Sequence, residues 1–265
     1  MCPKCGHDDG TRLSKRHSIQ CKLCRRQTSI TAGTLFHKTK IPLVTWFWLI
    51  FLMMQDKRGI STMRAADLLG MHYTTVWNLM HKLRIAMSDR DESHTLSGYV
   101  EIDEAFFGGK SKKKRGRGAS NKKRVYVMVE RLNRKAGDAA MFVAMERDGS
   151  EYRRVVEARL EPMTHVRTDG FHMNSVIHGV VGRLNMQKFS KSQSPGPVEN
   201  ADRVISLAKR QLLGTYHQFC SRRHLQRFLD EFCYRFNRRY QWYQLACRLI
   251  TACSLHTPVS YAAVS

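Results

Sequence analysis

Acidic residues are scarce in this sequence. Its 265 residues include 22 Asp and Glu against 45 Lys and Arg, which gives a formal net charge of +23 at pH 7. Such an excess of positive charge opposes compaction unless a polyanion neutralises it, so nucleic acid is the first candidate partner. A hydrophobic content of 42% still supplies folded cores and excludes disorder of the whole chain.

Long hydrophobic runs and a disulfide framework are also missing. The longest apolar run, residues 41–55, is shorter than the roughly 20 residues that cross a bilayer, so we expect a buried helix and no membrane partner. Four of the eight cysteines form two C-x-x-C pairs, which indicates a reducing cytosol rather than disulfides. We expect the other four to be small buried residues: Cys220, Cys233, Cys247 and Cys253.

The hydrophobic pattern changes twice along the chain. Residues 1–32 are polar, residues 40–90 have helical periodicity, and residues 97–255 first alternate as strands do and then return to helical periodicity. This order predicts a mixed α/β domain that follows two small N-terminal modules.

The first module carries a metal-binding pattern. Cys2 and Cys5 form CPKC, Cys21 and Cys24 form CKLC, and fifteen residues separate the pairs. Two such turns aim four thiolates at one point, which is the tetrahedral donor set of structural Zn²⁺. Because four thiolates leave no open position, we predict a structural ion. Four free thiols and a redox pair are the alternatives.

The second module has the pattern of a helix-turn-helix. In residues 61–84, Ala66 is a small residue between packed helices, Gly70 suits the turn, and Val76 packs in the second helix. The second helix would lie in the DNA major groove. It would expose His72, Tyr73, Thr74, Thr75, Asn78, His81 and Lys82. A helical hairpin that serves as a linker or dimer contact is the alternative.

Carboxylates stand at several element boundaries in the third segment. Asp103 lies in YVEIDEAFFGG near the end of a strand, Asp169 ends HVRTDG, and Glu199 and Asp202 begin a helix. If they converge, their oxygens suit Mg²⁺ or Mn²⁺ and metal-dependent phosphoryl transfer. Turn formers and helix caps are the alternative for these residues.

Basic residues follow the first carboxylates at once. Nine Lys and Arg fall within residues 110–124, among glycines that give the segment flexibility. We expect this loop to contact DNA phosphates, although a solvated loop or a localisation signal has the same composition. The side chains that we expect at phosphates are Lys112, Lys113, Lys114, Arg115, Lys209 and Arg210.

The motifs together resemble a known family. CPKCG with CKLC, VEIDEAFFGGK, TDG and SLAKRQLLGTYHQFCSRRHLQRFLDEFCYRFNRR are similar to bacterial insertion-sequence transposases of the zinc-ribbon, acid-triad type. The resemblance implies a zinc ribbon at residues 1–32, a helix-turn-helix at 40–90 and a ribonuclease-H-like α/β catalytic domain at 97–255. It also implies metal-dependent cleavage and transfer of DNA strands at element ends, by a cytoplasmic, nucleoid-associated protein that forms a homo-oligomer on DNA.

The resemblance also implies the catalytic residues. By similarity, Asp103 and Asp169 are the first two metal-binding acids, Glu199 or Asp202 is the third, and Lys209 follows on the same helix. Asp202 stands where the family usually has Glu, and Glu199 where Asn is common. A regulatory DNA-binding protein descended from such an enzyme is therefore the alternative function, and a structure-specific nuclease without strand transfer is a third.

Overall fold

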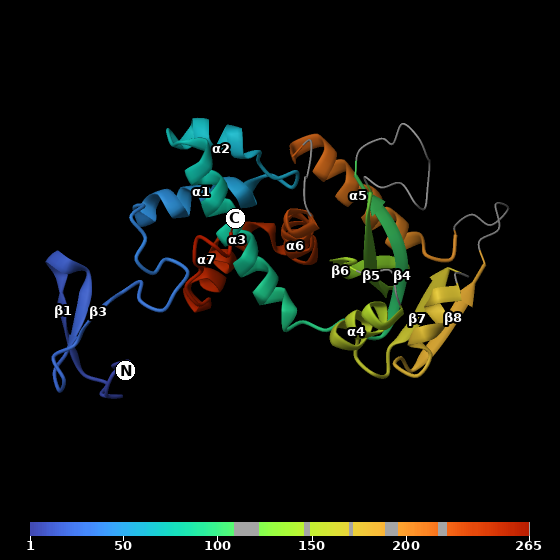
Figure 1. Ribbon diagram of the computed structural model, residues 1–265, viewed down its shortest axis with the longest axis horizontal. Coiled ribbons are helices and arrows are strands. Elements are labelled where there is room, and N and C mark those ends of the chain that lie inside the picture. Colours follow the sequence, from blue (N-terminus) through green and yellow to red (C-terminus); the bar gives the residue numbers. More distant parts are fainter. Residues whose placement is uncertain (109–121, 146–148, 170–171, 189–195, 217–221, 265) are drawn as a thin grey trace.

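The structure is a computed structural model that describes residues 1–108, 122–145, 149–169, 172–188, 196–216 and 222–264. Figure 1 shows a small sheet at one end of the molecule, helices in the middle and a larger sheet with its own helices at the other end. The basic residues Lys112, Lys113, Lys114 and Arg115 lie outside the described residues, so their contact with DNA stays a prediction.

The small N-terminal sheet has almost no apolar core. It consists of β1 (Gly10–Leu13), β2 (Ser18–Cys21) and β3 (Gln27–Ser29), paired antiparallel in that order. Among the described side chains of residues 1–34, the buried hydrophobic ones are Cys2 and Cys21. Burial of so little apolar surface cannot fold about 30 residues, so this module needs another source of stability.

The helical part contains helices from both ends of the sequence. Helices α1 (Leu43–Gln55), α2 (Thr62–Leu69) and α3 (Tyr73–Glu92) share one core with the C-terminal helix α7 (Leu245–Leu255). The sequence analysis did not predict this packing of α7. Of the four cysteines that were expected to be buried, Cys233 and Cys253 are buried, whereas Cys247 is exposed, so the expectation was wrong for Cys247. Cys220 lies outside the described residues.

Helix α1 buries one face only. Trp46, Ile50 and Met53 are buried, whereas Trp48 and Phe51 on the opposite side are exposed. The predicted helix in residues 41–55 is therefore confirmed, but its burial is partial. Among the described residues, every helix falls short of the length or apolar character that crossing a membrane requires.

The larger sheet contains five strands in the described part of the chain. Strands β4 (Tyr99–Phe107), β5 (Lys123–Leu132) and β6 (Lys135–Val143) pair antiparallel, and β7 (His165–Asp169) and β8 (Arg183–Gln187) continue parallel to β4. The order β6-β5-β4-β7-β8 puts β4 at the centre. This mixed sheet confirms the predicted α/β class, and its order is that of the ribonuclease-H-like fold.

Helices cover both faces of the sheet. Helix α4 (Gly149–Arg159) packs on one face, and α5 (Glu199–Gln211) and α6 (Arg222–Asn237) pack on the other. Because alternate residues of a strand point to opposite faces, Ile102 of β4 contributes to the α4 side. Ala105 and Phe107 contribute to the α5 side, which Asp103 therefore shares.

A buried ion pair connects the helical part to the sheet domain. Arg84 of α3 donates from Nε to Oε2 of Glu231 of α6 at 2.8 Å, and both side chains are fully buried. The Tyr216 hydroxyl donates to the other Glu231 oxygen, and Arg235 lies within 3.3 Å of it. Burial alone would raise the pKa of Glu231, but the two arginines hold it below its ordinary value.

We expect Glu231→Gln to lower the free energy of unfolding by about 3–5 kcal/mol, because it leaves the buried Arg84 charge uncompensated. Urea unfolding followed by circular dichroism measures the change. Glu157→Gln is the matched control, since it breaks an exposed ion pair with Arg153 on α4 and should change stability little. Equal effects of the two substitutions would contradict this role for the buried pair.

Candidate active site and metal-binding cluster

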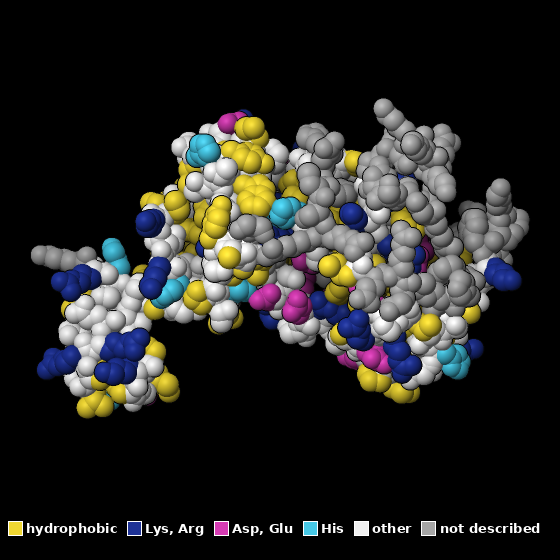
Figure 2. All heavy atoms as spheres, in the orientation of Figure 1, with side chains coloured by type: hydrophobic (Ala, Val, Ile, Leu, Met, Phe, Trp, Pro, Cys, Tyr) yellow, Lys and Arg dark blue, Asp and Glu magenta, His cyan; other side chains and the backbone are white. Residues whose placement is uncertain are grey.

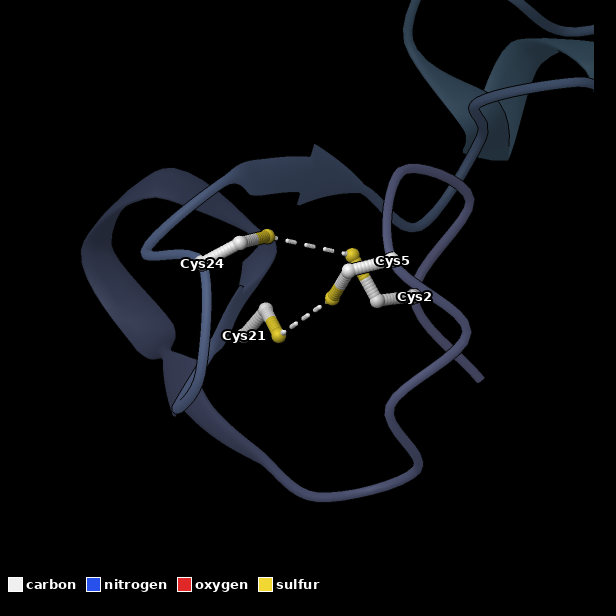
Figure 3. Close-up of side chains that lie close together, drawn as sticks. All are labelled: Cys2, Cys5, Cys21 and Cys24. Carbon is white, nitrogen blue, oxygen red and sulfur yellow. Dashed lines mark hydrogen bonds between the residues drawn. The ribbon is translucent and has the colours of Figure 1, made fainter.

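The four N-terminal cysteines converge on one point. Figure 3 shows Cys2 and Cys5 facing Cys21 and Cys24, and all four sulfurs lie within 4.8 Å of one another. The Sγ atoms of Cys2 and Cys24 are 3.5 Å apart, and those of Cys5 and Cys21 are 3.6 Å apart. Four sulfurs at ~2.3 Å from a tetrahedral zinc ion lie ~3.8 Å from one another, so the donor set fits structural Zn²⁺.

The backbone around these cysteines favours thiolates. Backbone N–H groups of Lys4 and Cys5 lower the pKa of Cys2 to about 6, and the N–H of Cys24 lowers the pKa of Cys21. The N–H of His7 acts in the same direction on Cys5, but burial and hydrogen bonds with the other thiols raise its pKa to about 12. Four thiolates at such close range therefore need a cation to compensate their charge.

The larger sheet brings two predicted acids together. β4 and β7 run parallel with Ile102 opposite Thr168, so Asp103 and Asp169 occupy the next position along adjacent strands. Asp103 is not at a strand end as expected, because β4 continues to Phe107 in pairing with β5. It lies at mid-strand, where the shorter β7 ends beside it.

Asp103 has a strongly perturbed carboxyl group. Burial raises its pKa from 3.8 to about 6, although the backbone N–H of Glu104 donates to its Oδ1 at 2.7 Å and opposes the shift. The charges of Asp202 and Asp169 raise the pKa further. Negative charges from β7 and α5 thus act on the buried Asp103 carboxyl group, which is the environment in which a bound cation is stabilising.

The first turns of α5 distinguish the two candidates for a third acid. The pKa of Asp202 is raised by burial of its carboxylate and by the charge of Glu101, and Asp202 also acts on Asp103. Glu199, one turn earlier, is paired with Arg203 on the exposed side of the helix. Asp202 is nevertheless exposed and Glu199 half-buried, so what favours Asp202 as the third acid is its charge effect on Asp103 and the pairing of Glu199 with Arg203.

Lys209 lies two turns further along α5, on the same side as Asp202. Its ammonium is 5.5 Å from the centre of the Phe107 ring. Burial and then the charge of Lys122 lower the pKa of Lys209, while Asp103 and Asp202 act in the opposite direction. A positive group thus stands beside the carboxylates. Arg210 follows on the exposed surface of the helix.

Sequence reasoning missed the role of Glu101. Its buried carboxylate accepts hydrogen bonds from the backbone N–H of Asn200 at 2.7 Å and of Ala201 at 3.1 Å, and from the Asn200 side chain at 2.9 Å. These contacts hold the N-terminus of α5, where a negative charge is favourable, against the middle of the sheet. The one sequence signal was a Glu two residues before Asp103 on the same strand face.

Glu104 belongs to the opposite face of the sheet. Its carboxylate lies 3.5 Å from Arg124 of β5, on the side that α4 covers. The three acids of YVEIDE therefore have three different environments. Glu101 contacts a helix N-terminus, Asp103 lies near the carboxylates of Asp169 and Asp202, and Glu104 forms an ion pair.

The predicted helix-turn-helix has the expected turn. Ser61 caps α2, Gly70 ends it in the left-handed conformation with φ of 61°, and His72 caps α3. The α3 side chains predicted to contact DNA begin with Tyr73 and Thr74, which are exposed.

Further along α3 the side chains that were expected to be exposed are increasingly buried. Thr75, Asn78 and Lys82 are half-buried, and burial lowers the pKa of Lys82. His81 was expected to be exposed, and this was wrong. It is fully buried against aromatic rings, because α6 packs on this part of α3, and its neighbours are Trp77, His224 and Phe228.

We expect Cys21→Ser to abolish zinc binding and to unfold residues 1–30, because this module has no other core. Elemental analysis should find one zinc per chain in the unaltered protein and none in the variant, and hydrogen exchange should become fast in the ribbon alone. Cys247→Ser, at an exposed cysteine, should keep the metal. A ribbon that stays folded without zinc would contradict the prediction.

We expect Asp103→Asn to stabilise the protein in the absence of divalent cations. The raised pKa means that the folded state loses stability as pH rises from 3.8 through about 6. The increase in the free energy of unfolding on substitution should therefore be largest at pH 8, at most about 3 kcal/mol, and smaller at pH 5.

Thermal unfolding at both pH values measures this gain. Asp67→Asn on the exposed surface of α2 is the control and should change little. A variant that is no more stable than the unaltered protein at pH 8 would show that Asp103 has no unfavourable charge environment.

Residues 95–237, more than half of the chain, match the family described as the ISXO2-like transposase domain. No curated protein matches the chain significantly. Similar solved structures include a pre-cleavage Mos1 transpososome (12% identity, TM-score 0.29, 84% of this chain and 82% of that one) and a Mos1 strand transfer complex (12%, 0.27, 82% and 80%). The family match runs from the residues before β4 to the end of α6 and contains the whole ribonuclease-H-like sheet. The chain therefore belongs to the ISXO2-like transposase family.

Proposed function

We propose that this protein is a DNA transposase that cleaves and transfers strands at the ends of its element, with divalent cations held by Asp103, Asp169 and Asp202. The observation that carries the proposal is the meeting of these carboxylates on one sheet face of a chain with a net charge of +23. Acids that merely form turns or cap helices have no reason to bury a carboxyl group among other negative charges, as Asp103 is buried here.

The donor set fits hard cations. Mg²⁺ and Mn²⁺ prefer carboxylate oxygens, and two ions ~4 Å apart would activate a water molecule and stabilise the leaving oxygen of a phosphodiester. Among the described residues, the carboxylate oxygens do not all lie within 4.8 Å of one another, as the cysteine sulfurs do. A two-ion site is wider than a single-ion site, so this spread is compatible with a metal pair.

The residues of this chain have separate tasks in the proposed reaction. Asp103 and Asp169 hold cations from adjacent strands, and Asp202 completes the group from α5. Glu101 fixes the start of α5, and so sets the position of Asp202 over the sheet. Lys209 stands beside the carboxylates and would bind a phosphate of the scissile strand, which also keeps the charge of the site balanced.

DNA would be held by surfaces away from the three carboxylates Asp103, Asp169 and Asp202. The exposed first turn of α3, with Tyr73 and Thr74, would enter the major groove, while Thr75, Asn78 and Lys82 flank it. Figure 2 shows Lys and Arg side chains on the zinc ribbon, which suits contact with phosphates. Binding of two element ends by a homo-oligomer remains part of the proposal.

The regulatory alternative rests on Asp202 in the place of the family's usual Glu. An Asp is shorter by one methylene, and this could leave the third acid out of reach. The charge of Asp202 nonetheless acts on Asp103 directly. We therefore favour the enzyme over a DNA-binding protein without activity.

We expect Asp103→Asn to abolish Mg²⁺- or Mn²⁺-dependent cleavage of DNA that carries the element ends, and to leave DNA affinity nearly unchanged. The amide keeps the shape of the side chain but removes the charge that binds the cation. Gel assays of nicked product, together with fluorescence anisotropy for binding, separate the two effects.

A second pair of variants tests the third acid. Asp202→Asn should lower cleavage by more than about 100-fold, whereas Glu199→Gln, which only breaks the exposed pair with Arg203, should keep most of the activity. Loss of cleavage in Glu199→Gln alone would reverse this assignment. Unaltered protein that binds the ends but never cuts them would favour the regulatory alternative.

A further inference from the structure

A pocket of about 430 Å³ lies on the same sheet face as the carboxylates, towards the starts of the parallel strands. Its floor is formed by β4, β7 and β8, with the end of β5 and the β5–β6 turn at one side. In the register of the sheet, Tyr99 is opposite His165, and His165 is opposite Arg183. Paired residues of parallel strands point to the same side, so these side chains share the face of Asp103.

Four arginines line this pocket without a partner. They come from β5, the β5–β6 turn, β7 and β8: Arg131, Arg134, Arg167 and Arg183. Within the described part of the chain, the guanidinium groups of these four arginines have no hydrogen bond or ion pair to another group, and their contacts are those of the backbone. The single carboxylate among the lining residues is Glu101, whose oxygens are occupied by the N-terminus of α5. The pocket therefore has a positive charge that the protein itself does not compensate.

The turn that carries one of these arginines is strained. Asn133 and Arg134 connect β5 to β6 and both have positive φ, 48° and 69°. A two-residue hairpin of this kind favours glycine at its second position, and an arginine there has a conformational cost. The sequence keeps a guanidinium at the rim of the pocket in spite of that cost, which favours a function for the side chain.

The pocket also contains an aromatic platform. The Tyr99 and His165 rings stack with centroids 5.1 Å apart and planes at 26°, and Tyr99 as a residue is 64% exposed. Guanidinium groups bind phosphates in a bidentate manner, and exposed aromatic faces stack on bases. The amides of Asn133 and Asn185 can add hydrogen bonds to bases or sugars.

We propose that this pocket binds an unpaired DNA strand, with phosphates on the arginines and a base stacked on Tyr99. A duplex hides the faces of its bases, so stacking on Tyr99 requires a strand that is locally unpaired. Tyr99 lies four residues before Asp103 on β4, which is ~13 Å along the strand. The pocket would thus hold a DNA strand that continues beyond the site of the three carboxylates. This inference rests on the proposed function, which supplies the DNA substrate.

Photo-crosslinking tests the pocket locally, without interference from the other basic surfaces. The full-length, zinc-containing chain is irradiated without magnesium, with a single-stranded deoxythymidine 12-mer that carries one 5-iododeoxyuridine, and the adduct is mapped by mass spectrometry. We expect the adduct on Tyr99 or His165, and at least tenfold less of it with the same probe as a duplex. Tyr99→Ala should reduce the adduct at this site about tenfold, whereas Tyr99→Phe should keep it.

Salt dependence tests the arginines. Arg134→Gln with Arg183→Gln should reduce the slope of log K against log salt for the single strand by ~1.4, since each lost contact contributes ~0.7. Arg153→Gln with Arg154→Gln removes the same charge from α4 on the opposite sheet face and should leave the slope unchanged.

Three results would overturn the inference: adducts that map outside the pocket, an equal yield with the duplex, or the same slope in both arginine variants. The crosslink is also expected in Asp103→Asn. A failure of the pocket is therefore distinguishable from a failure of the proposed cleavage activity, which is measured separately.

Discussion

The contact between Glu101 and the start of α5 determines the geometry of the whole site. A carboxylate buried in the central strand is costly unless it is fully hydrogen-bonded, and here two backbone N–H groups and the Asn200 amide supply the bonds. Asn200 and Ala201 follow Glu101 by 99 and 100 positions in the sequence, so the contact is between distant segments. It fixes where α5 crosses β4, and thereby where Asp202 and Lys209 lie relative to Asp103.

The remaining packing makes this arrangement rigid and extends it to the helices. The apolar face of α5 packs on β4, β5 and β6, and α6 packs beside it on the same face of the sheet. Through Arg84 and Glu231, α6 is also joined to α3, the helix whose first turn we propose to contact DNA. Because the pair is fully buried, a displacement of α3 relative to the sheet would expose or separate two charges. Helix α3 and the carboxylates are therefore held in one framework.

The sequence predicts the structural features that depend on a local residue pattern. It does not predict the contacts between segments that are far apart in the chain. The cysteine spacing and the alternation in β4 to β8 predict the metal-binding cluster and the α/β class. The role of Glu101 was not predictable, because its partner Asn200 is far away in the sequence. His81 looked exposed by helical periodicity, but α6 covers it. The sequence leaves the third acid open between Glu199 and Asp202, and the pairing of Glu199 with Arg203 on α5 is one reason why we propose Asp202.

The central claim is that the carboxylates of β4, β7 and α5 bind divalent cations. Anomalous diffraction from crystals soaked in Mn²⁺ tests it most directly, because the peaks locate the ions without any assay of activity. The account predicts manganese between Asp103 and Asp169, with Asp202 as the ligand from α5, and no such peak in Asp103→Asn crystals. Manganese bound elsewhere, or the absence of any peak at these three side chains, would contradict it.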